Sequence, residues 1–333
     1  MLTRRAWQAL SKGEDVIPWA IGKNGVLYGA KGMTILRSVI KKQENWEWSA
    51  VGTIPDSGQV TAIYELPSSQ SKLIVSLRNG KNFLLDTVTG LSDMVHQFPS
   101  GYAYDWSFTE KPDGTVFIGE YGNKGQANNP RRVYKTTEGT NWDLVCEIDN
   151  AYGRHVHKVL YDPYDDALWV SQGDGDSKLW RATGPNYDDL VFQSVRQPTA
   201  GLVFEDCILW GEDGSVPNGI SRWDRATNQY ETVLNLSQDY PDYSDYIFDM
   251  GVMSDGTVLA LSAAYSSGRG TIWAGKSPEY REWELVWVGQ SNYMWRILVG
   301  ISDTVWFTSQ HHQWRAYQLA YKPEATRAER QQQ

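Results

Sequence analysis

Histidine is scarce in this chain of 333 residues, yet two of its five histidines lie close together in Arg154-His155-Val156-His157. The segment is typical of a strand, in which side chains two positions apart face the same way. We therefore expect His155 and His157 to project together, with Arg154 and Val156 on the other side. Two imidazoles on one wall could act as acid and base, bind a carboxylate or ligate a metal. Hydrogen bonding to neighbouring strands is the alternative role.

A carboxylate and a phenol adjoin at Glu120-Tyr121, where another predicted strand ends. This pair suits acid/base or nucleophilic chemistry, and Glu120 could complete a metal site with the two histidines. The predicted catalytic residues are His155, His157, Tyr121, Glu120 and Arg154. A purely structural Glu120 is the alternative reading.

Carboxylates and aromatic rings elsewhere are suited to sugar binding, because rings stack on sugar C–H faces and carboxylates accept hydroxyl hydrogens. Gly173-Asp174-Gly175-Asp176 is a tight acidic loop, and residues 239–246 alternate carboxylates with phenols. The predicted ligand-binding residues are Tyr104, Asp174, Asp176, Tyr243, Tyr246, Trp295 and Arg296. A simple turn at Asp174 and a protein-contact surface around Tyr243 remain open alternatives.

Metal-binding motifs of standard spacing are absent from the sequence, so we predict no metal and no cofactor. A structural Ca²⁺ at the acidic loop, or Zn²⁺ at the histidines, is the alternative. The two cysteines, Cys146 and Cys207, are too few for a disulfide framework, and we expect reduced thiols.

The overall charge and composition exclude several classes of protein. Lys and Arg number 31 against 40 Asp and Glu, a net charge of −9, which disfavours nucleic acid as a partner. No apolar run reaches the roughly 20 residues of a membrane helix, so we expect no membrane insertion. The basic start lacks a following apolar run, which predicts no secretory signal and a cytoplasmic or virion-associated phage or bacterial protein.

Short β-rich runs recur along the chain every 40 to 52 residues, the period of four-stranded propeller blades. Asn-Gly and Asp-Gly turns precede several of them, so each run should be the second strand of a hairpin. The seven runs begin at Val26, Leu73, Val116, Leu168, Ile208, Val258 and Val305. A second signature, an aromatic residue followed by acidic and aliphatic ones, as in Trp142-Asp143-Leu144-Val145, marks a later strand of each repeat.

The two chain ends are predicted to share one blade. Trp7-Gln8-Ala9-Leu10 carries the later-strand signature before any complete hairpin, whereas the last repeat lacks its outer strand. We predict that residues 3–11 complete the last blade and remove an open sheet edge. The predicted fold is all-β: a single β-propeller over residues 1–322, with seven four-stranded blades closed by the N-terminal strand. Six or eight blades are the alternatives if one repeat is irregular. Residues 323–333 are predicted to form a polar tail.

One face of such a propeller should carry function. Innermost strands begin on the face that also receives the connections between blades, and most of the candidate residues fall there. Functional groups concentrate on loops held by a rigid scaffold. We therefore expect the site on this face, at the mouth of the central channel.

The turn Thr136-Thr137-Glu138-Gly139-Thr140-Asn141-Trp142 is similar to the Ser-x-Asp-x-Gly-x-x-Trp turn of the sialidase-like propellers with BNR or Asp-box repeats, although it is one residue short. The Arg-Ile-Pro motif of true sialidases is absent. The histidine segment also resembles propeller-fold polysaccharide lyases that act on uronate-containing polymers. That resemblance implies a cation to neutralise the uronate, Arg154 or Arg296, a base, His155 or His157, and Tyr121 as the acid.

These observations predict a carbohydrate-recognising propeller that binds a glycan or polysaccharide. Its activity, if catalytic, would be that of a polysaccharide lyase or a glycosidase, and for a glycosidase Glu120 and Asp174 would form the carboxylate pair. The alternative is a noncatalytic binding or adhesion propeller of a virion or cell surface that recognises a glycan or a protein.

Overall fold

The computed structural model describes most of the chain, and every structural statement below concerns the part that it describes. The described residues are 8–12, 16–39, 47–122, 131–148, 153–174, 178–194, 197–213, 218–240, 246–264, 268–290, 293–300, 305–311 and 313–320. The predicted polar tail, residues 323–333, lies outside them.

The described strands form four-stranded antiparallel sheets and one two-stranded ribbon. Each sheet is named here by its innermost strand. The β2 sheet holds β2 (Ile17–Ile21), β3 (Val26–Lys31), β4 (Thr34–Val39) and β5 (Ser49–Thr53). The β6 sheet holds β6 (Val60–Glu65), β7 (Lys72–Leu77), β8 (Lys81–Asp86) and β9 (Ser92–Gln97). The β11 sheet holds β11 (Phe108–Glu110), β12 (Val116–Gly119), β14 (Arg132–Thr136) and β15 (Asp143–Glu147).

The next three sheets follow in the same order along the chain. The β16 sheet holds β16 (His155–Asp162), β17 (Ala167–Gly173), β18 (Leu179–Thr183) and β19 (Asp189–Ser194). The β20 sheet holds β20 (Pro198–Val203), β21 (Cys207–Glu212), β22 (Gly219–Asp224) and β23 (Gln229–Asn235). The β24 sheet holds β24 (Tyr246–Val252), β25 (Val258–Ala264), β26 (Arg269–Gly275) and β27 (Trp283–Gln290).

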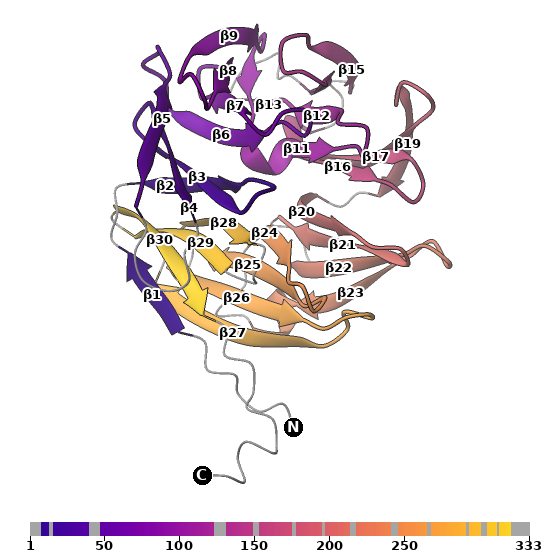
Figure 1. Cartoon of the computed structure of the whole chain (residues 1–333). Helices are drawn as coiled ribbons and strands as arrows, with labels where there is room; N and C mark the ends of the chain where they lie inside the picture. Colours follow the sequence, from indigo (N-terminus) through magenta and orange to yellow (C-terminus); the bar gives the residue numbers. More distant parts are fainter. Residues whose placement is uncertain are drawn as a thin grey trace.

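These six sheets are each built from one continuous stretch of the chain, whereas the remaining one combines both ends. The β28 sheet holds β28 (Tyr293–Val299), β29 (Val305–His311), β30 (Gln313–Ala320) and β1 (Gln8–Lys12). β1 pairs antiparallel with β30, so that Gln8 lies opposite Ala320, and Figure 1 shows the two strands side by side. The predicted pairing of the N-terminal strand with the end of the chain is thus present between these two strands.

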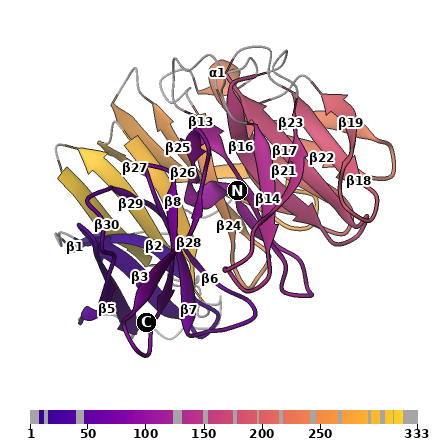
Figure 2. The ribbon, with the colours of Figure 1, turned by 90° about the horizontal axis from the view of Figure 1, so that it is seen from above.

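Three small elements complete the described structure. The ribbon pairs β10 (Gly101–Tyr102) with β13 (Tyr121–Gly122), η1 (Asp105–Ser107) is a 3₁₀ turn before β11, and α1 (Leu236–Asp239) follows β23. In Figure 2, β13 and α1 lie toward the same side of the molecule. We call this side, where the innermost strands begin, the connection face.

The repeat analysis located the strands correctly. Each of the β-rich runs is the second strand of a different sheet: β3, β7, β12, β17, β21, β25 or β29. Gly25, Gly114 and Gly256 take φ values of 72°, 91° and 81° in the tight turns before β3, β12 and β25. This left-handed conformation is the one that Asn-Gly and Asp-Gly steps supply, so the turn prediction is confirmed.

Successive sheets pack face to face, and the core lies between them. β16 and β17 pack on β20, β20 and β21 pack on β24, and β28 packs on β24 and on β2. Trp169, Trp210 and Trp273 are fully buried in these interfaces. Trp142 and Trp283 end equivalent turns, and each indole donates a hydrogen bond to the carbonyl three residues before it, of Gly139 at 2.8 Å and Tyr280 at 2.9 Å. These two tryptophans therefore have a structural role in closing their turns.

The innermost strands other than β11 share an irregularity that was not expected from the sequence. In β2, β6, β16, β20, β24 and β28 the pairing with the second strand skips one residue near the start of the strand. Such a β-bulge leaves one residue unpaired and re-aims its side chain. The bulged residues are Trp19, Thr61, His157, Thr199, Phe248 and Trp295.

Candidate functional site

The two histidines and Tyr121 form one packed group on the connection face. The ring of Tyr121 stacks on His155 with centroids 3.8 Å apart, and the His155 and His157 centroids are 4.7 Å apart. Tyr121 comes from the ribbon and the histidines from the start of β16, so the group joins neighbouring sheets. The prediction that His155 and His157 project together is confirmed. The reason differs, because His157 occupies the bulge rather than a regular strand position.

Further aromatic rings extend this group across the ribbon. Tyr104 stacks on Trp106 at 4.1 Å and meets Tyr121 edge-on at 4.9 Å. The Tyr102 hydroxyl lies 3.3 Å from that of Tyr104. Tyr104 and Tyr121 are half-buried, so part of each ring is open to solvent. We call Tyr102, Tyr104 and Tyr121 the tyrosine platform.

His157 is held in a nearly closed environment. Its side chain is buried, and its Nδ1 lies 3.5 Å from Asp213 Oδ2 at the end of the neighbouring β21 strand. Burial lowers the pKa of His157 to about 4, against the opposing effect of the Asp174 charge. The imidazole is therefore neutral at neutral pH. Burial likewise raises the pKa of the Tyr121 phenol, which keeps its proton.

A glycine makes room for the His157 ring. Gly173 ends β17, and a Cβ at this position would fall on His157 Nε2. Only glycine leaves the imidazole where it is, because any other residue places an atom in the space of the ring. The sequence analysis treated Gly173 as part of a turn and missed this role.

Asp174 and Arg154 lie on the solvent side of the histidines. Asp174 follows Gly173 directly, and one of its oxygens lies within 4.8 Å of the ligand nitrogens of both His155 and His157. The Arg154 guanidinium is 3.9 Å from Asp174 Oδ2, and the two side chains are 52% and 31% exposed. A donor set of two imidazoles and a carboxylate could hold a divalent cation.

Glu120 takes a different place from the one expected. Its carboxylate is fully buried, accepts a hydrogen bond from the Ser100 amide at 3.3 Å and pairs with Arg132 at 3.5 Å. Burial raises its pKa to about 7, although Ser100 and Arg132 lower it. Among the described residues, Asp174 and not Glu120 completes the group of possible metal ligands with the histidines.

Arg296 lies in the central channel. Its Nε is 2.7 Å from Asp105 Oδ2, its Nη1 is 3.6 Å from Asp249 Oδ2, and it donates to the Trp19 carbonyl at 3.2 Å. A guanidinium with these partners is not a free cation for a substrate carboxylate. The role implied for it by resemblance therefore passes to Arg154 alone.

The channel itself holds a cavity of about 480 Å³. Residues from the innermost strand of each four-stranded sheet line it, and Asp105, Lys158, Asp249 and Arg296 bring charge into it. Burial raises the pKa of Asp105 to about 6 and lowers that of Lys158. Lys158, Asp249 and Arg296 each follow a bulged residue directly, a position that no residue pattern in the sequence marks.

The remaining predicted binding residues are dispersed. Tyr246 begins β24, two sheets away from β16, with its ring 5.8 Å from that of Phe248. Trp295 is the bulged residue of β28, and its side chain is not described. Asp176 and Tyr243 lie outside the described residues.

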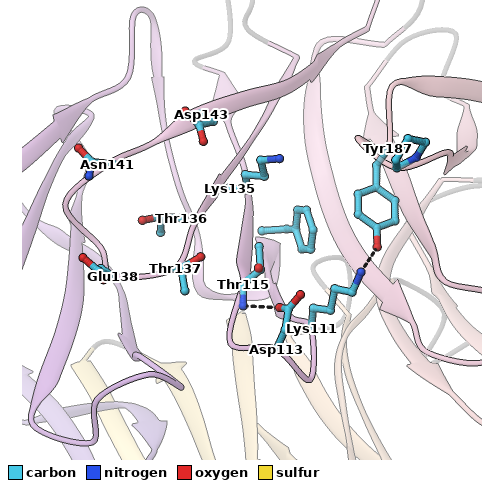
Figure 3. Close-up of a pocket in the computed structure, with 12 residues that line it drawn as sticks. Lys111, Asp113, Thr115, Lys135, Thr136, Thr137, Glu138, Asn141, Asp143 and Tyr187 are labelled. Carbon is cyan, nitrogen blue, oxygen red and sulfur yellow. Dashed lines mark hydrogen bonds between the residues drawn. The ribbon is translucent and has the colours of Figure 1, made fainter.

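A second cavity, of about 500 Å³, lies beside the Asp-box-like turn (Figure 3). The β11–β12 hairpin, strands β14 and β15 and the turn before β19 line it. Figure 3 shows the Lys111 amine against the Tyr187 hydroxyl, at 2.8 Å. Lys111 also pairs with Asp166 at 3.2 Å, so this amine is already engaged. The cavity is polar and mixed in charge, without an open aromatic ring for a sugar to stack on.

Comparison with known proteins shows the fold. No protein family matches the sequence, and no curated protein matches it. Among solved structures, virginiamycin B lyase from Staphylococcus aureus, a catalytically inactive histidine-to-alanine variant with quinupristin, has a TM-score of 0.68 and 14% identity over 95% of this chain and 100% of that one.

Other propellers match in a similar way. The WD40 propeller domain of Doa1 has a TM-score of 0.64 at 14% identity, over 94% of this chain and 97% of that one. An extracellular domain of a putative hybrid two-component system from B. thetaiotaomicron has a TM-score of 0.66 at 11% identity, over 96% of this chain and 40% of that one.

The chain is a single β-propeller with four-stranded blades. Identities this low establish the architecture and not an activity. The resemblance to sialidase-like propellers and to polysaccharide lyases is not shown by these matches. In the described part of the chain, no helix has the length and apolar character needed to cross a membrane.

Proposed function

We propose that the connection face binds a glycan that contains uronate residues. The observation that carries this proposal is the exposed Arg154 guanidinium, which adjoins His155 in the chain, while the His155 ring stacks on Tyr121 of the tyrosine platform. Arginine pairs with carboxylates in a two-pronged geometry, and open aromatic rings accept the apolar faces of sugars. The buried rings of His155 and His157 stack against Tyr121 and hold it in place.

A rigid support for this site follows from the arrangement of the sheets. We infer that the β28 sheet is a seventh blade and that it closes the ring, because β1 pairs with β30 while β28 packs on both β24 and β2. A closed ring has no open edge and holds its loops at fixed separations. The site is then built on strand ends of neighbouring blades rather than on one mobile loop.

Binding of uronate polymers to the purified chain tests the proposal. We expect calorimetry to detect binding of at least one uronate polysaccharide and not of its neutral counterpart, and we expect Arg154→Ala to weaken it at least tenfold. Arg281→Ala is the matched control, because Arg281 is 48% exposed and pairs with surface carboxylates elsewhere. Equal affinities of the two variants, or no binding by the unmodified protein, would sink the proposal.

Cleavage of the bound glycan by β-elimination is a second candidate function. Tyr121, placed as the acid, and His155 or His157, placed as the base, belong to one stacked group, and Arg154 can neutralise the uronate. A propeller of similar fold, virginiamycin B lyase, is inactivated by a histidine-to-alanine change. Ultraviolet absorbance of unsaturated products tests this candidate: a rise that His157→Ala abolishes supports it, and a flat trace leaves binding alone.

A further inference from the structure

Three donor side chains on the connection face have the types and spacing of a metal site. One ligand atom each from His155, His157 and Asp174 lies within 4.8 Å of the other two, the one such group found among the described residues. In a tetrahedral site with metal–ligand bonds of about 2.0–2.1 Å, the donors are about 3.4 Å apart. Small side-chain rotations therefore bring all three onto one ion.

The backbone holds these donors from two paired strands. His155 lies opposite Gly173 in the β16–β17 ladder, His157 is the bulged residue, and Asp174 directly follows Gly173. A bulge beside a site re-aims a side chain that regular pleating would point elsewhere. The His157 bulge and the missing side chain of Gly173 together let the imidazole reach Asp174.

A carboxylate outside the group lies near the second ring nitrogen of His157. The Nδ1 atom of His157 is buried, has no hydrogen-bond partner in the described part of the chain, and lies 3.5 Å from Asp213 Oδ2. Metal-bound histidines commonly direct their second nitrogen at a carboxylate, which fixes the ring and its tautomer. This arrangement leaves Nε2, on the side of Gly173, for coordination.

We propose that His155, His157 and Asp174 bind one divalent transition-metal cation of the zinc class, with Asp213 orienting His157. Imidazole ligands favour such ions over Ca²⁺ or Mg²⁺, which prefer all-oxygen sites. Three protein ligands leave a position open, and the partly exposed Asp174 and Arg154 place that opening toward solvent. The open position takes a carboxylate oxygen of the glycan, a step that rests on the proposed function.

Metal binding and general-base catalysis by the same histidines exclude each other. Coordination uses the lone pair that a base would need, so an occupied site leaves no free imidazole for proton abstraction. A chelator therefore separates the two roles. If a metal bridges the protein and the glycan, the chelator weakens glycan binding. If a histidine is the base, the chelator leaves the rate of elimination unchanged or increases it.

Metal content and zinc affinity of the full chain test the site. We expect about one zinc per chain by elemental analysis after dialysis, and at least a hundredfold weaker zinc binding by calorimetry in His157→Ala and Asp174→Asn. Asp213→Asn should weaken zinc binding 10- to 100-fold. Asp143→Asn, an exposed carboxylate on β15, is the control and should bind as the unmodified protein does. Substoichiometric zinc in the unmodified protein, or equal affinities in all variants, would overturn the site.

Cobalt provides a test that does not depend on folding of the variants. Added Co²⁺ should give the visible absorption of a tetrahedral site in the unmodified chain, and stoichiometric zinc should remove it. A spectrum no different from that of Co²⁺ in buffer would overturn the proposal.

Glycan binding with and without metal separates this inference from the proposed function. Zinc-dependent glycan binding supports both. Zinc binding without any glycan binding supports the site and overturns the glycan function, whereas glycan binding without zinc binding overturns only the site. Zinc and glycan binding that are independent of each other overturn the bridge.

Discussion

At the scale of single residues, the position of His157 on the connection face depends on the absence of a side chain at residue 173. Gly173 leaves space for His157, and a methyl group there would displace the imidazole from its position near Asp174 and Asp213. We expect Gly173→Ala to lower the free energy of unfolding by about 1–3 kcal/mol through overpacking and to weaken glycan binding at least tenfold. Chemical denaturation and calorimetry measure the two effects.

The control for this variant is Gly58→Ala. A Cβ at Gly58 approaches only side-chain atoms, at 3.2 Å or more, and its backbone is not in the left-handed region. This variant should keep both properties. Unchanged glycan affinity in Gly173→Ala would show that the position of His157 is irrelevant to binding.

Glu120 makes stability depend on pH. Its pKa is raised from 4.5 to about 7 in the folded protein, so the native state holds a proton that the unfolded chain releases between these values. Stability therefore falls as pH rises from about 4.5 to about 7, by up to about 3 kcal/mol. We expect Glu120→Gln to flatten this slope in urea denaturation between pH 5 and 8.

Glu147→Gln is the control, because Glu147 pairs with the same arginine, Arg132, but is 51% exposed. That variant should keep the slope of the unmodified protein. An identical pH dependence in Glu120→Gln would contradict the assignment of the slope to Glu120.

The sequence predicted contacts among the site residues of the histidine segment and Tyr121, but not the contacts made by more distant segments of the chain. His155, His157 and Tyr121 were expected together and lie together, whereas Arg154 was expected on the other side of the strand and lies 3.9 Å from Asp174. Asp213 was not expected beside His157, because 56 positions separate them and only the packing of the β16 sheet on the β20 sheet brings them close. Glu120 is buried against Arg132 on a different strand, and the sequence around Glu120 does not indicate this pairing.

At the scale of elements, the bulge near the start of the innermost strands other than β11 provides contacts between neighbouring sheets. Thr61 and Thr199 are bulged residues whose hydroxyls donate across the interface, to the Ala103 carbonyl at 2.6 Å and the Ile247 carbonyl at 2.5 Å. His157 occupies the equivalent position in β16. The bulge that carries a structural threonine in β6 and β20 thus carries an imidazole in β16, which is able to bind a metal or transfer a proton.

Replacing a bulged hydroxyl tests this account of the interfaces. Thr199→Val keeps the shape of the side chain but leaves the buried Ile247 carbonyl without this donor, which should cost about 1–2 kcal/mol. Urea denaturation measures the change, and Thr227→Val at an exposed turn serves as the control. A loss no larger than that of the control would contradict a linking role for the bulged residues.

Strands were predictable from the sequence, whereas bulges were not. Alternation and Asn-Gly or Asp-Gly turns depend on local chain geometry, which each repeat shows directly. A bulge depends on the register between two strands and on the neighbouring sheet. Its residues are as different as Thr61, Phe248 and Trp295, so no residue type signals it.

At the scale of the whole molecule, one arginine connects sheets that are distant along the chain. Arg296 from β28 contacts Asp105 before β11, Asp249 on β24 and the Trp19 carbonyl on β2. Both carboxylates are buried, so removal of the guanidinium leaves them without this counter-charge. Such a loss is typically about 3–5 kcal/mol.

We therefore expect Arg296→Met to be strongly destabilising, and more so at pH 8 than at pH 5. Burial already raises the pKa of Asp105 to about 6, and without Arg296 protonation at low pH removes the unpaired charge. Thermal and urea denaturation at both pH values measure this, with Arg281→Met as the exposed control. A loss below about 1 kcal/mol would show that the channel charges do not stabilise the fold.

The central claim is that a uronate-containing glycan binds on the connection face, and a crystal structure of the protein with a uronate oligosaccharide tests it most directly. The account predicts sugar density over Tyr104 and Tyr121, with a carboxylate within hydrogen-bonding distance of Arg154. Density confined to the channel cavity or to the cavity of Figure 3 would contradict it.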